Sequence, residues 1–363
     1  MDIQPGQAPW FVSIIITSHN YGRFLREAID SALNQTYPAV EVIVVDDGST
    51  DNSREIIASY GDCIIPILQE NHGQASAFNA GIARSHGRVV IFLDADDVLL
   101  PQTAQQVVAA FQQNPELVKV QYPMRVIDAC GIPTGAIKPA EHLPRPSGDL
   151  RRNILRIPFD TTWMSTSGNA FAMSVLEHIF PIPESNFGIL ADYYLALITP
   201  LFGPVLFLDT IGASYRIHGS NNHQPGTSTI SLPYIRQTIQ YSYGTLPYIQ
   251  KFADQLGLET RDTVKRENLS VSLLANRLIS LKLDPLHHPI PEDTLFGLFK
   301  WGVTASLKRF DVSWTLRFLF IVWFGAMVLA PKPVARWLAE KFSMPESRGR
   351  FNQILGRLHG VHQ

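Results

Sequence analysis

The stretch VVIFLDADDVLLP, residues 89–101, decides how the rest of the chain is interpreted. Five apolar residues that suit a buried strand lead directly into Asp94, Asp96 and Asp97. Carboxylates this close together repel one another and are costly to remove from water. Three of them at the end of a buried strand therefore predict a binding site, because a purely structural strand end has no use for them.

Three apolar runs upstream also have the composition of buried strands: VSIIIT (12–17), VEVIVV (40–45) and CIIPIL (63–68). Helical spacing appears between them, for example where Leu25, Ile29 and Leu33 recur every four residues. This alternation predicts an α/β protein with a mostly parallel sheet flanked by helices. Such sheets bind ligands beyond the carboxyl ends of their strands, where this chain carries TSHN, DDGSTD, ENHG and DADD. The four polar clusters are therefore expected to converge on one edge.

The common nucleotide-binding motifs do not occur in the sequence. No GxGxxG follows the first strand and there is no GxxxxGK[ST], so dinucleotide and P-loop sites lose their main support. Without a glycine-rich cradle, phosphates need another counter-charge. Mg²⁺ typically binds one or two carboxylates together with substrate phosphates. DADD is therefore interpreted as a metal–diphosphate site, with Mg²⁺ or Mn²⁺ as the expected cofactor.

Taken in order, these motifs resemble those of the family-2 glycosyltransferases, which have the GT-A fold. The resemblance is carried by VSIIITSHNYGRFLREAIDSALNQTYPAVEVIVVDDGSTD, ENHGQASAFNAG and FLDADD. It is strong over about residues 10–100 and continues more weakly to about residue 222. It implies an inverting transferase that moves a sugar from a nucleotide-diphosphate sugar, expected to be a UDP-sugar, to a glycan or lipid-linked acceptor. The expected setting is polysaccharide or glycolipid synthesis.

The resemblance also assigns roles to residues at the strand ends. Asp46 would accept a hydrogen bond from the base, and His19 would stack on the base where the family more often has tyrosine. The alternative for Asp46 is a turn or helix-capping role. The loop residues Asn71, Gly73 and Asn79 are expected to shape their loop first and to contact the ligand second. The expected nucleotide-binding residues are Thr17, His19, Asn20, Asp46, Asn71, Gly73, Asn79 and Asp94.

The metal ligands implied by the resemblance are Asp96, Asp94 and His218. Asp96 is the more direct ligand, and Asp94 lies nearer the ribose. His218 belongs to IGASYRIHGSNN (211–222), which resembles the family's YR-x-H segment; a hydrogen-bonded loop histidine is the alternative. Arg216 in the same segment could help to neutralise phosphate. The family often has a basic residue just before the position of Asn79, and here that residue is Phe78.

In the acceptor half, the family usually has a Glu-Asp pair whose carboxylate serves as catalytic base, and this chain has Ala191-Asp192. An aspartate with a reference pKa of about 3.9 is ionised at neutral pH and can accept the proton of an attacking hydroxyl. Asp192 is therefore the expected base, with helix capping as the alternative. The expected sugar and acceptor contacts are Gly168, Asn169 and Asp97.

The predicted organisation is a catalytic domain over 1–225, with a nucleotide-sugar half (1–100) and an acceptor half (101–225), followed by a helical C-terminal region, 226–363. Within the acceptor half, VKVQYPMRVID (118–128) is predicted as one strand and 131–148 as a long connection. In the C-terminal region, amphipathic helices are predicted over 234–257 and 264–283.

From Phe296 onward there are ten Lys and Arg against three Asp and Glu, although the whole chain has a net charge of −2. The apolar run FLFIVWFGAMVLA (318–330) would form a helix of about 20 Å, too short to span a bilayer. With the neighbouring tryptophans and basic residues, it suits either a helix in the headgroup layer or a core helix. The first of these alternatives predicts a peripheral membrane contact through residues 296–340.

Two separated cysteines and no signal-peptide pattern in MDIQPGQAPWF predict a cytoplasmic protein. If residues 296–340 contact a membrane, the protein is expected to be peripheral on its inner face. No nucleic-acid partner is expected, because the basic residues are interleaved with an apolar helix. Three other functions remain open: a DxD-type phosphatase or phosphotransferase, a nucleotidyltransferase, and a non-catalytic relative that binds nucleotide-sugars or glycans.

Overall fold

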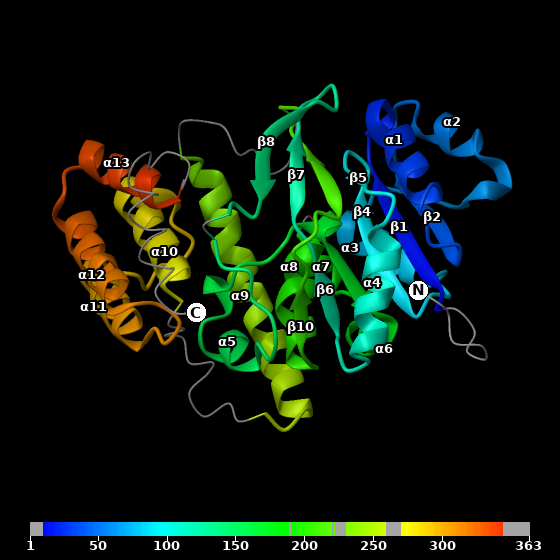
Figure 1. Cartoon of the computed structure of the whole chain (residues 1–363). Coiled ribbons are helices and arrows are strands. Elements are labelled where there is room, and N and C mark those ends of the chain that lie inside the picture. The colour runs from blue at the N-terminus through cyan, green and yellow to red at the C-terminus, as the bar shows by residue number, and fades with distance from the viewer. Residues whose placement is uncertain are drawn as a thin grey trace. The chain divides into compact units, whose positions relative to one another are not determined.

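The computed structural model describes residues 10–141, 143–188, 190–219, 221, 230–258 and 270–343 (Figure 1). The chain divides into two compact units. The first unit comprises residues 1–141, 145–150 and 163–221, and the second comprises 142–144, 151–162 and 222–363. The domain boundary predicted between residues 225 and 226, and the N-terminal segment before Trp10, lie outside the described residues.

A seven-stranded sheet forms the centre of the first unit (Figure 1). In spatial order its strands are β10 (Val205–Phe207), β6 (Lys119–Gln121), β9 (Asn169–Ala172), β4 (Val89–Asp94), β1 (Val12–Ser18), β2 (Val40–Asp47) and β3 (Ile65–Gln69). Neighbouring strands are parallel, except that β9 runs antiparallel to β4 and to β6. This pairing confirms the predicted mostly parallel sheet. Its strands β1, β2 and β4 carry apolar side chains buried on both faces, which explains their continuous apolar sequences.

Helices cover both faces of this sheet. α1 (Gly22–Leu33), α2 (Ser53–Ala58) and α4 (Thr103–Gln113) share one hydrophobic cluster with alternate strand residues such as Ile14 and Val44. On the other face, α3 (Gln74–Ile82) places Phe78 against Phe92 with 4.2 Å between ring centroids. Because strand side chains alternate between faces, Asp94 shares the face of Phe92. The remaining helices of this unit are α6 (Met173–Ile179), α7 (Glu184–Phe187) and α8 (Ala191–Ile198).

A second, four-stranded sheet contains β5 (Val98–Leu99), β11 (Ala213–Arg216), β7 (Met124–Ile127) and β8 (Pro133–Lys138), in that order. Two predictions are wrong here. Residues 118–128 form two strands in different sheets, β6 and β7, separated near Pro123, which has no N–H to offer a strand ladder. The region from residue 131 is not a plain connection, because β8 pairs antiparallel with β7.

The second unit is helical, as predicted for the C-terminal region. Its helices are α5 (Arg151–Arg156), α9 (Leu232–Gln255), α10 (Val271–Leu283), α11 (Leu295–Lys308), α12 (Trp314–Leu329) and α13 (Lys332–Ser343). Short 3-10 turns occur in both units, at Gly61–Cys63, Pro158–Asp160, Thr166–Gly168, Thr199–Leu201 and Pro285–His287. Residues 264–269 of a predicted helix lie outside the described residues. Within the described ranges, none of the helices combines the length and the apolar character that a membrane crossing requires.

Candidate active site

The strand register brings three of the predicted polar clusters to one edge of the seven-stranded sheet. In the parallel pairing of β1 with β4, Thr17 is the partner of Asp94. In the pairing of β1 with β2, Ser18 is the partner of Asp46. The segments TSHN, DDGSTD and DADD therefore leave the sheet side by side, as the sequence predicted. The fourth segment, ENHG, is tied to the same edge because Gly73 N donates to Asp47 Oδ2 at 2.8 Å.

The DADD carboxylates are crowded and poorly hydrated. Asp97 is 1% exposed; its Oδ1 accepts a hydrogen bond from Arg216 N at 2.9 Å, whereas Oδ2 has no partner among the described residues. Burial, followed by the charge of Asp96, raises the pKa of Asp97 to about 8. Burial and the charges of Asp97, Asp96 and Asp192 hold the pKa of Asp94 well above its usual range. A bound cation would relieve this repulsion.

His218 lies against Asp96, with 2.9 Å between Nε2 and Oδ2. The other ring nitrogen, Nδ1, is 2.9 Å from Arg23 Nη2, an arrangement in which arginine donates and Nε2 carries the proton. Asn221 Nδ2 also donates to Asp96 Oδ2, at 3.2 Å. In the described ranges, no three His, Cys, Asp or Glu side chains gather as a ready-made metal site. Asp94, Asp96 and His218 are the side chains here that could ligate a metal, and His218 would then exchange its hydrogen bond to Asp96 for the metal.

Asp46 has one carboxylate oxygen without a hydrogen-bond partner among the described residues. Its Oδ2 accepts hydrogen bonds from Arg54 Nε at 2.8 Å and from Ser49 N at 3.2 Å. The other oxygen, Oδ1, is buried and has no partner among the described residues. An unsatisfied buried acceptor costs about 1–3 kcal/mol, and a ligand N–H would remove that cost. The turn role also exists, through Ser49, but it uses only one of the two oxygens.

The first loop holds His19 and Asn20 against the second loop. His19 is exposed, with Nδ1 2.8 Å from Asp47 O and Nε2 3.2 Å from Asn71 Nδ2. Asn20 has φ +61°, and its Oδ1 accepts a hydrogen bond from Thr50 N at 2.7 Å, so it does not cap α1. His19, Asn20 and Asn71 are therefore neighbours, and the ring of His19 lies open to solvent.

Two predicted residues are engaged by the main chain around them. Asn79 donates through Nδ2 to Ile182 O at 2.9 Å and accepts from Ile182 N at 2.8 Å, which shows its loop-shaping role. Gly73 has φ +90°, and a Cβ there would lie 2.4 Å from Gly188 O, so only glycine fits without strain. These contacts join α3, which starts after Gly73 and contains Asn79, to Ile182 and Gly188.

The segment 164–169 lies against the acidic cluster. Asn169 Nδ2 donates to the carbonyls of Met164, Ser165 and Thr166, which fixes the turn. A Cβ at Gly168 would lie 2.9 Å from the side chain of Met164. Ser167 Oγ accepts a hydrogen bond from Asp94 N at 3.0 Å. Gly168 and Asn169 are thus close to the carboxylates, with Asn169 shaping the turn.

Asp192 lies in the first turn of α8 and is half-buried, and Ala191 before it is fully buried. Burial raises the pKa of Asp192, while the charges of Lys138 and Lys119 act in the opposite direction. Lys119 is 2% exposed, and burial lowers its pKa to about 7. The expected base therefore has two lysines near it and no second acid beside it in the chain.

Several residues of this region were not predicted from the sequence. Lys119 and Lys138 lie outside every motif, and Asn221 belongs to a quoted segment without a role of its own. Arg216, expected to help neutralise phosphate, is 0% exposed and is held by Asp96 O at 2.8 Å and by Glu27 Oε2 at 2.5 Å. Its guanidinium is already engaged inside the protein.

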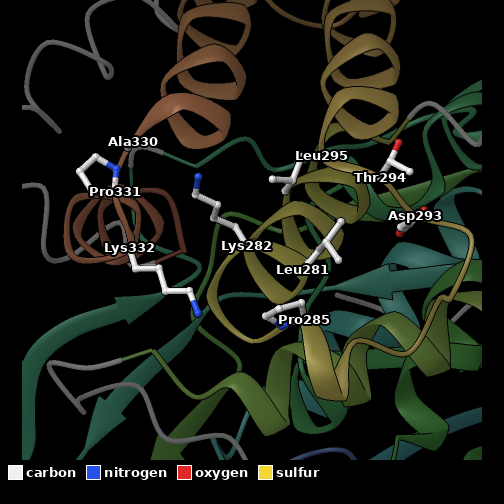
Figure 2. Close-up of a pocket in the computed structure, with 9 residues that line it drawn as sticks. All are labelled: Leu281, Lys282, Pro285, Asp293, Thr294, Leu295, Ala330, Pro331 and Lys332. Carbon is white, nitrogen blue, oxygen red and sulfur yellow. The ribbon is translucent and has the colours of Figure 1, made fainter.

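A pocket of about 430 Å³ belongs to the second unit (Figure 2). Its walls are mainly apolar, and Lys282 Nζ donates to Val328 O at 2.7 Å beside it. None of the predicted site residues lines it. The lining residues are Leu281, Lys282, Pro285, Asp293, Thr294, Leu295, Ala330, Pro331 and Lys332.

Comparison with known proteins gives a consistent result. The family model described as glycosyl transferase family 2 matches residues 13–180. An uncharacterized glycosyltransferase of Nostoc sp. is 38% identical over 262 residues, which is 70% of this chain and 79% of that protein. An uncharacterized glycosyltransferase of Rickettsia prowazekii is 50% identical over 90 residues, which is 25% of this chain and 28% of that protein.

Among solved structures, residues 1–349 of TarS from S. aureus share the fold, with a TM-score of 0.54, 16% identity and 92% of each chain covered. The same TarS segment in complex with UDP-GlcNAc gives a TM-score of 0.50 at 14% identity, also with 92% of each chain covered. The fold likeness confirms the predicted GT-A architecture.

Proposed function

The chain belongs to glycosyltransferase family 2, and from this premise we propose that it is an inverting, metal-assisted enzyme that uses a UDP-sugar as donor and a hydroxyl group as acceptor. The main support is the strand register that sets Thr17 beside Asp94 and Ser18 beside Asp46. This edge also lies within electrostatic reach of Asp192. Nucleotide, metal and base therefore have candidate residues in one unit of the chain.

The nucleoside would be recognised through Asp46. Its unpartnered Oδ1 can accept the N–H of a pyrimidine base, and the exposed ring of His19 can stack on that base. TarS, which shares the fold, has been solved with UDP-GlcNAc, which makes uridine the first base to test. Asn20 and Asn71 lie within hydrogen-bond distance of the His19 ring, and Thr17 is the partner of Asp94 in the pairing of β1 with β4.

Asp94, Asp96 and His218 would hold the divalent metal. Two carboxylates and an imidazole suit Mn²⁺ or Mg²⁺ when phosphates complete the coordination. Burial and the neighbouring carboxylates raise the pKa of Asp94, and Oδ2 of Asp97 has no partner among the described residues. Both observations support a cation site. When bound, the metal would neutralise charge on the departing nucleoside diphosphate.

Asp192 would act as general base. It accepts the proton of the acceptor hydroxyl as that oxygen forms a bond to the anomeric carbon. The bond between this carbon and the donor phosphate breaks, and the nucleoside diphosphate leaves with the bonding electrons. A single displacement inverts the configuration at the anomeric carbon. Gly168, Asn169 and Asp97 would line the sugar and acceptor side of the reaction.

The test is release of UDP from a panel of UDP-sugars, with Mn²⁺ or with EDTA, measured for the wild type and for Asp192→Asn. We expect metal-dependent release by the wild type, and at least about a 100-fold loss in the variant with UDP binding retained. Substantial activity of Asp192→Asn would place the base elsewhere. Absence of binding to any nucleoside diphosphate would contradict the proposed function as a whole.

We also propose that α11–α13 rest on the inner face of an anionic membrane, where a lipid-linked acceptor would be presented. Apolar side chains are exposed along one face of α12, namely Trp314 (71%), Phe318 (63%) and Leu329 (86%). Exposed basic side chains accompany them, which matches an anionic surface by charge. These are Lys300, Lys308, Lys332 and Arg336.

Vesicle co-sedimentation tests this contact. The wild type should sediment with vesicles that contain phosphatidylglycerol and less with pure phosphatidylcholine vesicles, and high salt should release it. Trp314→Ala combined with Phe318→Ala should weaken the sedimentation. A wild type that stays in the supernatant with both kinds of vesicle would rule out the proposed membrane contact.

A further inference from the structure

The proposed site has a deficit of positive charge near the donor diphosphate. The family's frequent basic residue is replaced by Phe78, which is fully buried and stacks on Phe92 in the core. Arg216 is fully buried and bonded to Asp96 O and to Glu27. Phe78 has no charge to offer a phosphate, and the Arg216 guanidinium could reach one only by breaking its present hydrogen bonds. Four carboxylates, those of Asp94, Asp96, Asp97 and Asp192, remain at the proposed site, and a bound diphosphate would add negative charge beside them.

Lys138 supplies a cation at this place from the second sheet. It is the last residue of β8, pairs with Met124 of β7, and is half-buried. Its Nζ lies 3.7 Å from the centroid of the Tyr215 ring on β11, which holds the ammonium over an aromatic face. The charge of Lys138 interacts with four carboxylates, in decreasing order those of Asp97, Asp192, Asp94 and Asp96.

The ammonium of Lys138 keeps its hydrogen-bonding capacity. Across the described residues, no side chain or carbonyl forms a hydrogen bond or a contact ion pair with its Nζ. A lysine ammonium offers three donors on a flexible stem, which suits a phosphate oxygen. The residue after Tyr215, Arg216, donates through its backbone N to Asp97 Oδ1 at 2.9 Å. The strand whose tyrosine ring lies under the ammonium is therefore joined directly to Asp97, a residue of the proposed sugar and acceptor side.

Resting on the proposed function, we propose that Lys138 binds the donor diphosphate at the phosphate that carries the sugar. In this position it would donate a charge-assisted hydrogen bond to the bound donor. The bond becomes stronger as the sugar–phosphate bond breaks, because negative charge accumulates on that phosphate. Lys138 would thus supply the positive charge that the family often has at the position of Phe78.

A neighbouring arginine provides a matched control. Arg125 lies one residue after Met124 on β7, so its side chain is on the opposite face of the sheet from that of Lys138. It is exposed, and its Nε donates to Ser214 Oγ at 2.8 Å. Arg125→Met removes a cation from the same hairpin without removing one from the face of Tyr215.

The experiment is calorimetric titration of UDP and of UMP, with Mn²⁺, into the wild type, Lys138→Met, Lys138→Arg and Arg125→Met. UMP lacks the phosphate that Lys138 would contact. For Lys138→Met we expect a loss of UDP affinity of about 10- to 100-fold, the usual range for a hydrogen bond to a charged group, with UMP affinity changed by less than about threefold. Lys138→Arg should retain most UDP affinity, and Arg125→Met all of it.

Equal UDP affinity of the wild type and Lys138→Met would overturn this inference while leaving the proposed function standing. A parallel loss of UDP and UMP affinity would also overturn it, because it would indicate a general change of charge or folding. Failure of the wild type itself to bind UDP, GDP or dTDP would overturn the proposed function and the role of Lys138 together.

Discussion

Replacement of Lys119 by methionine tests how strongly a buried charge lowers the stability of the first unit. The side chain is 2% exposed on β6, and its Nζ is 5.5 Å from the centroid of the Phe171 ring. Burial lowers its pKa from 10.5 to about 7, although the charge of Asp192 opposes this shift. At about 1.4 kcal/mol per pKa unit, the buried ammonium lowers the free energy of unfolding by up to about 5 kcal/mol.

The pH dependence follows from the sign of that shift. Between pH 7 and pH 10.5 the unfolded chain binds the lysine proton more than the folded chain does, so this group makes stability rise with pH. Lys119→Met should therefore raise the free energy of unfolding at pH 7 by about 1–4 kcal/mol, as for other buried charges replaced by apolar residues. At pH 10 the gain should fall to about 1 kcal/mol or less.

Urea-induced unfolding at pH 7 and pH 10, followed by circular dichroism, measures both values. The exposed Lys251→Met serves as control and should change stability by less than about 0.5 kcal/mol. A variant of Lys119 that is less stable than the wild type at pH 7, or a gain that is the same at both pH values, would refute this reasoning about the buried ammonium.

Three further predictions concern the site. Asp46→Ala should weaken uridine binding by about 10- to 100-fold in calorimetry, because it removes the acceptor for the base. Arg54→Ala should weaken uridine binding by less than about threefold, and a larger loss for Arg54→Ala than for Asp46→Ala would exclude a base contact. His218→Ala should raise the Mn²⁺ concentration needed for half-maximal UDP release at least about tenfold, and an unchanged requirement would exclude it as a ligand. Because burial raises the pKa of Asp192, kcat/KM should fall as pH decreases through a value above the ordinary aspartate pKa of about 4. A pH–rate profile that stays flat down to pH 4 would show that no such base is required.

The central strands were predictable because their own residues determine them. Ile14, Ile15 and Ile16 are all fully buried, so β1 faces protein on both sides and an unbroken apolar run is its signature. The same reasoning located β2 and β4, and parallel order then placed their polar ends together. These features depend on local composition and on the general handedness and order of α/β sheets.

The second sheet could not be predicted because distant pairing determines it. Residues 133–136 of β8 are exposed and include Pro133 and Gly135, which are poor strand residues, yet they form a strand through pairing with β7. Arg216 illustrates the same limit, since its position beside a motif suggested phosphate, whereas Glu27, far away in the sequence, binds its guanidinium. Side-chain roles of this kind appear only when the tertiary contacts are known.

The central claim is that the carboxylates at the end of β4 bind a cation, and that this cation binds the diphosphate of a nucleotide held beside Asp46. Calorimetric titration of UDP with Mn²⁺ and with EDTA, for the wild type and Asp96→Asn, tests it most directly. We expect Mn²⁺ to raise the UDP affinity of the wild type at least about tenfold and to have little effect on Asp96→Asn. An affinity that does not depend on the metal, or a metal effect that survives in Asp96→Asn, would contradict the claim.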